Sequence, residues 1–288
     1  MNPGFRDLGE GAFESGLARL DKDPEWRDDR VDLDGPFRLR FPQAQGWGEE
    51  LLVASLLKRY AGASKNPVEV FASAQVCSIL EHDSAFLPKL RRAMEGRSPL
   101  AILRHALMGN LLDEPFLPLA PFPAGRPSTV NRRLRLGIAW ASVSKGRCIS
   151  KKSVPVGEFL SLLTGIDADF ISLQRKLAVA DPNGLAKGRG IPGLADEVLD
   201  ATTDVHVNAL VEAIRSLDCL VTISTTTTHI AAAMGVRVEL IAAEREGQQW
   251  FWRVQGRDRN CFYPSVRIHI GNATKGNWWK QSLASLKA

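Results

Sequence analysis

The chain has 288 residues, 44% of them hydrophobic and 24% charged, which is typical of globular proteins and suits two domains of about 150 residues each. The net charge of +5 is compatible with an anionic ligand but does not by itself indicate a nucleic-acid-binding protein. The four cysteines lack CxxC spacing, the first residues lack the features of a secretion signal, and no apolar run reaches the roughly 18 residues of a membrane span. These features argue against a zinc site, a disulfide framework and a transmembrane segment, and they predict a cytoplasmic protein.

The first part of the chain alternates strand and helix patterns. An N-terminal extension, residues 1–35, is polar and acidic apart from a short amphipathic helix pattern at 11–20. Beyond it, apolar residues recur at helical spacing between short strand-like runs. The predicted strands are 37–41 and 68–73, and the predicted helices are 50–62, 75–83, 86–95 and 98–112. They predict a first α/β domain over residues 36–120.

A proline-rich stretch separates this domain from the next. Four of the sixteen prolines lie between residues 117 and 128, which predicts a linker at 121–131. The predicted strands that follow are 133–142, 168–174, 219–224 and 236–243, and the predicted helices are 155–165, 207–218 and 228–235. Strands separated by helices of this length imply βαβ units and a parallel sheet, so we expect a second α/β domain over residues 132–288.

A run of hydroxyl side chains follows the most apolar of these strands. Ser224, Thr225, Thr226, Thr227 and Thr228 come directly after "CLVTI" and precede an alanine-rich helix. Ligands in open α/β sheets bind beyond the carboxyl ends of strands, and a helix N-terminus favours anions. The run therefore predicts a phosphate-binding site. The alternative is that one threonine caps the helix and its neighbours are merely tolerated, and that His229 is a packed or capping residue rather than a ligand contact.

Several segments, read together, resemble family 9 glycosyltransferases, the ADP-heptose:lipopolysaccharide heptosyltransferases. They also look like the glycosyltransferase region of bacterial tetratricopeptide-repeat proteins. The segments are "QGWGEELLVASLL", "LRLGIAWAS", "KKSVPVGEFLSLL", "FISLQRK", "LDCLVTISTTTTHIAAAMGV", "CFYPSVRI" and "KGNWWK", and their order agrees with the family pattern over residues 36 to 282. The resemblance implies an α/β, GT-B-like fold of two Rossmann-like, doubly wound domains facing a cleft. The donor nucleotide would bind the second domain and the acceptor the first.

The resemblance also implies roles for particular residues. Thr225 and His229 match the family's threonine and histidine at the donor diphosphate, whereas Ser224 stands where the family usually has aspartate. Glu49 takes the place of the family's catalytic base, an aspartate, in a turn that Gly46 and Gly48 would shape. The alternative for Glu49 is a first-turn helix carboxylate that is favoured by the helix dipole.

Cationic and polar side chains follow two other predicted strands. Lys145, Lys151 and Lys152 lie in the loop after the strand that ends near Trp140, where Ser142 is a further possible donor. At the same sheet edge as the threonines they would clamp a phosphate, although an isolated charge run is usually a solvated loop. Gln174 ends the next strand. The resemblance places it near the nucleotide base and ribose, and the alternative is a polar strand terminus.

The sequence therefore predicts an inverting, metal-independent glycosyltransferase with no cofactor, a nucleotide-sugar as donor and a glycan or protein as acceptor. No nucleic-acid partner is expected, and peripheral membrane contact remains possible without a membrane span. A catalytically inactive nucleotide-sugar-binding or scaffold domain of GT-B fold is the alternative, because Glu49 and Ser224 both depart from the family pattern. A sugar-nucleotide epimerase is a third, less favoured hypothesis.

Overall fold

The structure, a computed structural model, divides into two compact units. It describes residues 3–24, 26–27, 38–41, 46–61, 68–90, 98–109, 112, 116–119, 133–142, 152–161, 163–174, 204–243, 249–252, 260–271 and 279–280. Unit 1 comprises Met1–Phe122, Ala233–Gly235 and Trp250–Pro264, and unit 2 comprises Pro123–Ala232, Val236–Gln249 and Ser265–Ala288. Two short later stretches of the chain thus belong to the unit that the first 122 residues form.

Unit 1 contains a parallel three-stranded sheet in the order β1-β2-β3. Its strands are β1 (Arg38–Arg40), β2 (Val68–Ala72) and β3 (Phe86–Leu90), and its helices after the first strand are α3 (Trp47–Ala61), α4 (Ala74–Leu80) and α5 (Pro99–Met108). Ser98 caps α5 by accepting a hydrogen bond from the Leu100 amide, at 3.1 Å, and Pro99 occupies the first turn. The expected alternation of strands and helices is confirmed here.

The helix predicted for residues 86–95 is wrong over its first five residues, which form strand β3. Pro88 lies in the middle of this segment, and a proline inside a helix removes a backbone donor and clashes with the preceding turn. In the structure Pro88 is paired with Val70 of β2, on an edge strand where proline is tolerated.

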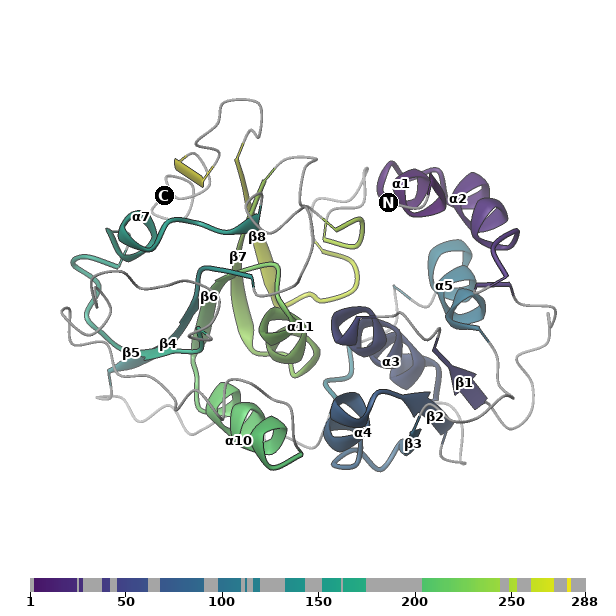
Figure 1. Cartoon of the computed structure of the whole chain (residues 1–288), viewed down its shortest axis with the longest axis horizontal. Coiled ribbons are helices and arrows are strands. Elements are labelled where there is room, and N and C mark those ends of the chain that lie inside the picture. Colours follow the sequence, from purple (N-terminus) through teal and green to yellow (C-terminus); the bar gives the residue numbers. More distant parts are fainter. Residues whose placement is uncertain are drawn as a thin grey trace. The chain divides into compact units, whose positions relative to one another are not determined.

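The N-terminal residues form two short helices, α1 (Pro3–Gly9) and α2 (Phe13–Leu20), which lie side by side in Figure 1. The predicted helix at 11–20 is confirmed as α2, whereas α1 was not predicted. The two helices approach closely because Gly4 and Gly16, where they cross, have no side chains. A Cβ atom on either glycine would lie only 2.8 Å from the carbonyl oxygen of the other. Asp7, which is buried, joins them by accepting from Ser15 Oγ at 2.9 Å and pairing with Arg19 Nε at 2.7 Å.

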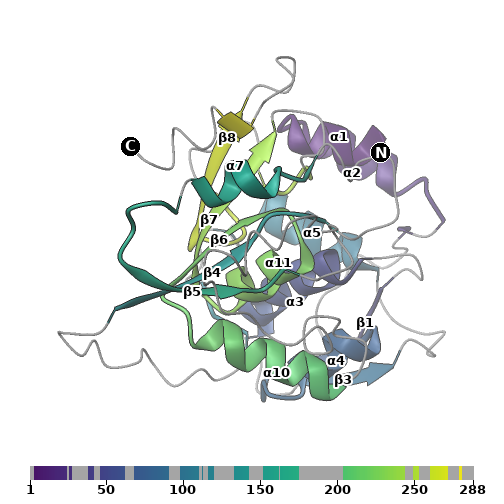
Figure 2. The same cartoon turned by 60° about the vertical axis from the view of Figure 1, so that its left-hand side comes forward.

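Unit 2 contains a parallel five-stranded sheet in the order β5-β4-β6-β7-β8. Its strands are β4 (Leu134–Ala139), β5 (Ala168–Ser172), β6 (Cys219–Ile223), β7 (Arg237–Ala243) and β8 (Val266–Gly271), and its helices are α7 (Val156–Ser161), α10 (Asp204–Arg215) and α11 (Thr226–Ala233). Figures 1 and 2 show α7 on one face of this sheet and α10 with α11 on the other. Sequence analysis had assigned no element to residues 266–271, so β8 is an addition.

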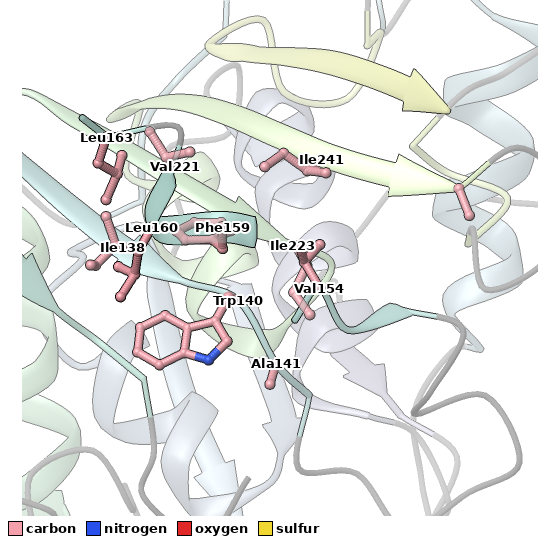
Figure 3. Close-up of a cluster of buried hydrophobic side chains, with 11 residues drawn as sticks. Ile138, Trp140, Ala141, Val154, Phe159, Leu160, Leu163, Val221, Ile223 and Ile241 are labelled. Atoms are coloured by element: carbon pink, nitrogen blue, oxygen red, sulfur yellow. The ribbon is translucent and has the colours of Figure 1, made fainter. Parts of the chain in front are cut away.

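One hydrophobic core cluster of unit 2 lies between α7 and the sheet. Phe159 and Leu160 of α7 pack over Ile138, Val221 and Ile223 of the strands beneath (Figure 3). All five residues of β6 are buried, which explains why its sequence is a continuous apolar run: a central parallel strand is covered on both faces. Among the described helices of both units, none combines the length and apolar character that crossing a membrane requires.

Candidate functional site at the carboxyl ends of β4, β5 and β6

The strand order of unit 2 marks one place as the expected ligand site. Numbered within the unit, β5-β4-β6-β7-β8 reads 2-1-3-4-5. From β4 the chain adds β5 at one side of the sheet, and from β6 it adds β7 and β8 at the other side. Ligands in such sheets bind at the carboxyl ends of the two strands where the direction reverses. Ala139 of β4 is in register with Thr222 of β6, so both strands end at the same edge of the sheet. The residues that follow them are those singled out in the sequence.

The threonine run begins helix α11, and part of it caps that helix. The Thr228 hydroxyl is fully buried; it donates to the Ile223 carbonyl at 2.6 Å and accepts from the Thr225 amide at 3.2 Å. The Thr225 hydroxyl lies 3.1 Å from that of Thr228, and the Thr225 carbonyl accepts from the amide of Thr228 at 3.1 Å. Thr225 and Thr228 therefore hold the strand end and the helix start together, much as a capping box does.

Thr226 and Thr227 differ from their neighbours. They occupy the first two positions of α11 and are half-buried. In the described part of the chain, neither their hydroxyls nor their backbone amides have a hydrogen-bond partner. Because the first amides of a helix point outward and carry partial positive charge, these two residues present four donors where an anion would bind. Ser224, half-buried just before them, has interactions of its own.

Lys152 adds positive charge near His229, at the start of α11. His229 is buried in the first turn of α11, and burial together with the nearby ammonium of Lys152 lowers its pKa to about 3. Its imidazole is therefore neutral at physiological pH, and only Lys152 is charged. An ammonium close to a helix N-terminus is unfavourable unless an anion lies between them.

The end of β4 is held by side chains on either side of it. Gln174 Oε1 accepts from the amides of Trp140 and Ala141, at 2.9 and 2.8 Å, and its Nε2 donates to the Ala141 carbonyl at 3.2 Å. The amide of Ser142, a buried residue, donates to Ser153 Oγ at 3.1 Å. Gln174 thus lies beside the predicted site, with its side-chain amide engaged by the backbone of the β4 end.

Trp140 is a residue at this edge that was not predicted as part of the site. Its indole is buried against Phe159, and its Nε1–H has no hydrogen-bond partner in the described residues. Leaving such a donor unpaired costs about 1–3 kcal/mol. The apolar strand pattern that ends at Trp140 indicated only that this residue would be buried, which it is.

In unit 1, the two adjacent carboxylates at the start of α3 have different surroundings. Glu50 is fully buried and its Oε2 accepts from the amide and the hydroxyl of Ser73, at 2.9 and 2.7 Å. Glu49 is half-buried, with its carboxylate over Gly46: a Cβ atom there would lie 2.6 Å from Glu49 Oε2. Gly46 therefore leaves room for the Glu49 carboxylate, and Gly48 is buried inside the first turn.

Tyr263 is a neighbour of Glu49 that the sequence did not reveal. Its phenol is fully buried, and burial raises its pKa, aided by the negative charge of Glu49 and opposed by a hydrogen bond with Ser55. Tyr263 comes from the stretch Trp250–Pro264, so a segment late in the chain completes the surroundings of Glu49 within unit 1.

Some predicted features lie outside the described residues. These are Lys145, Lys151 and the linker 121–131. Within the described ranges, no group of three or more His, Cys, Asp or Glu side chains is arranged to hold a metal ion.

Solved structures that are similar to this chain include two sugar transferases. The first is a glycosyl transferase family 9 protein from Veillonella parvula DSM 2008, with a TM-score of 0.56, 8% identity, and coverage of 90% of this chain and 91% of that one. The second is the dodecameric iron-containing heptosyltransferase TibC in complex with ADP-D-beta-D-heptose, with a TM-score of 0.51, 12% identity, and coverage of 88% and 76%. No family model and no curated protein matches the sequence. The chain therefore has the α/β, GT-B-like fold of these two glycosyltransferases, as its sequence predicted.

Proposed function

We propose that the chain is an inverting, metal-independent glycosyltransferase that binds a nucleotide-diphosphate sugar in unit 2. The observation that carries the proposal is the start of α11, where the amides and hydroxyls of Thr226 and Thr227 have no partner among the described residues, and where the charge of Lys152 acts on His229 in the same helical turn. The shared fold supports it, and the heptosyltransferase with that fold was solved with ADP-D-beta-D-heptose. A fold can serve several chemistries, so the residues at the start of α11 carry more weight for this function than the shared fold does.

The donors at α11 suit the leaving group of such a reaction. When the bond between the anomeric carbon and the diphosphate breaks, negative charge grows on the departing phosphate oxygen. Helix amides, hydroxyls and an ammonium stabilise that charge without a change in their own protonation. We assign Thr226, Thr227 and Lys152 to the diphosphate, with Lys145 and Lys151 as further cations and Ser142, Ser224 and His229 as neighbours.

Glu49 is the proposed general base. It would take the proton from an acceptor hydroxyl, whose oxygen attacks the anomeric carbon from the face opposite the diphosphate. The structure distinguishes it from Glu50, because the Glu50 carboxylate is buried and held by Ser73 whereas Glu49 is half-exposed. The acceptor would be a glycan or a protein, and the reaction would take place in the cytoplasm.

The test is a titration of the protein with ADP-, UDP- and GDP-sugars, followed by a variant at Glu49. One donor should stabilise the chain by RT ln(1 + [L]/Kd), or about 2.7 kcal/mol at a hundredfold excess over Kd. With that donor, release of free nucleoside diphosphate should fall roughly 10²- to 10⁴-fold in Glu49→Gln while the stabilisation stays unchanged. Glu14→Gln, another first-turn helix carboxylate in unit 1, should change neither.

Three outcomes separate the hypotheses. If no nucleotide-sugar stabilises the chain, neither the transferase nor a nucleotide-sugar-binding module is correct. Stabilisation by a donor that is never turned over would favour the inactive binding or scaffold domain. Full turnover in Glu49→Gln would remove Glu49 from the mechanism and leave the donor site in place.

A further inference from the structure

The side chain of Gln174 continues the sheet beyond the point where its strands end. The last regular backbone hydrogen bond between β4 and β5 runs from the Leu173 amide to the Ile138 carbonyl, at 2.9 Å. One residue further, the Gln174 side-chain amide takes the place of a backbone peptide. Its oxygen accepts from two successive β4-end amides, those of Trp140 and Ala141, and its nitrogen donates to the Ala141 carbonyl.

On their other side, residues 140–142 at the end of β4 are held by residues 153 and 154, which precede α7. The Val154 amide donates to the Trp140 carbonyl at 2.9 Å, and the Ser142 amide donates to Ser153 Oγ at 3.1 Å. Residues 140–142 and 152–154 are therefore joined by hydrogen bonds, and we call this pair of segments the neck. Lys152, whose charge acts on His229 at the start of α11, belongs to this neck.

We propose that Gln174 is a positioning residue for diphosphate binding, and not a ligand of the nucleotide. Its three hydrogen bonds fix the neck against β5, and the neck sets where Lys152 stands relative to the first amides of α11. This inference rests on the proposed function, since it concerns the same site. It assigns to Gln174 a different role from the base or ribose contact that the sequence resemblance implied.

The variant Gln174→Met tests this role because methionine keeps the length and the apolar stem but neither accepts from the two amides nor donates to the carbonyl. ADP, UDP and GDP are titrated calorimetrically into wild type and variant, at a temperature where both are folded. For the nucleotide that wild type binds best, Kd should rise roughly 10- to 100-fold, the range known from metal sites when a residue that orients a ligand is removed. Hydrogen exchange of the Trp140 and Ala141 amides should accelerate in the same variant.

Asp218→Leu is the matched control. At the opposite, amino end of β4, the Asp218 carboxylate accepts from the Arg135 amide at 2.8 Å, which is the same kind of side-chain bond to the same strand. This variant should also be less stable than wild type, but it should bind the nucleotide with unchanged affinity. A purely structural contribution of Gln174 would make the two variants alike in Kd.

The outcomes distinguish the inference from the function on which it rests. A raised Kd in Gln174→Met with an unchanged Kd in Asp218→Leu supports the positioning role. Equal affinity of wild type and Gln174→Met, with faster exchange at residues 140 and 141, overturns the inference and leaves the proposed function intact. If wild type binds none of the three nucleotides, the proposed function fails and the inference fails with it.

Discussion

At the scale of single residues, His229 illustrates how burial decides a protonation state. Its pKa is lowered to about 3 by desolvation and by Lys152, whereas an unfolded histidine has a pKa of about 6.5. Between these two values the unfolded chain binds a proton that the folded chain does not. Stability is therefore fully present above about pH 6.5 and is lost progressively as the pH falls toward 3.

The resulting prediction concerns His229→Gln, which keeps a polar side chain that does not titrate. Wild type should lose about 2 kcal/mol of unfolding free energy through His229 between pH 7 and pH 5, and the variant should lack this part of the decrease. Urea unfolding at the two pH values measures both. A decrease of equal size in wild type and variant would show that His229 is accessible to protons in the folded protein.

Residue roles were harder to predict from the sequence than residue positions. Sequence analysis placed the threonine run and Gln174 at strand ends, and the structure has them there. It did not distinguish Thr228, whose hydroxyl is bonded to the Ile223 carbonyl, from Thr227, whose hydroxyl has no partner among the described residues. Successive side chains of a helix point in different directions around its axis, so one threonine faces the strand end and the next does not. A run of identical residues does not show in the sequence which threonine faces which way.

At the scale of elements, strands β7 and β8 are joined by a buried polar contact. Glu239 Oε2 lies 2.7 Å from His269 Nε2, both side chains are buried, and Arg237 donates to Glu239 Oε1 at 2.6 Å. Burial alone would raise the pKa of Glu239, but the hydrogen bonds from His269 and Arg237 outweigh it and hold that pKa below its usual value. The contact therefore contributes stability above the unfolded pKa of glutamate, which is lost as the pH falls through the lowered value.

Removing one partner of this contact should cost more than removing both. Glu239→Leu removes the acceptor from the buried Nε2 of His269, and leaving one buried polar atom without its hydrogen bond costs about 1–3 kcal/mol. The double variant Glu239→Leu/His269→Leu should recover much of this loss, because both buried polar side chains of the pair are then gone and the exposed Arg237 can turn to solvent. Urea unfolding of the single and double variants measures the coupling. The exposed pair Arg215–Glu212 on α10 is the control, and its removal should cost less than about 0.5 kcal/mol.

Strands buried on both faces were easier to predict from the sequence than edge strands. The strand β6 is buried on both faces, and its unbroken apolar run was recognised. The edge strand β3, with Pro88 at its centre, was taken for part of a helix, because its identity comes from pairing with β2 and not from its own pattern. The edge strand β8 alternates buried with more accessible residues and was not assigned at all.

At the scale of the whole molecule, unit 1 is assembled from distant parts of the chain. The Phe5 ring stacks on Trp250 with centroids 5.9 Å apart, and Phe116 meets Tyr263 at 6.5 Å. Arg59 Nη2 donates to the Phe262 carbonyl at 2.9 Å. The late stretch contributes five buried aromatic side chains to this unit, namely Trp250, Phe251, Trp252, Phe262 and Tyr263. A linear division of the sequence into domains does not anticipate such a contribution.

Residues 1–122 alone should therefore fail to fold. Five aromatic side chains bury about 200 Å² each, so their loss removes about 25 kcal/mol at about 25 cal/mol per Å². That exceeds the roughly 5–15 kcal/mol by which a typical protein is stable. The fragment should show no cooperative thermal transition by circular dichroism, whereas the full chain should show one under the same conditions. Cooperative unfolding of the fragment would mean that the first 122 residues hold a sufficient core of their own, and that Trp250–Pro264 adds to unit 1 without being needed for its folding.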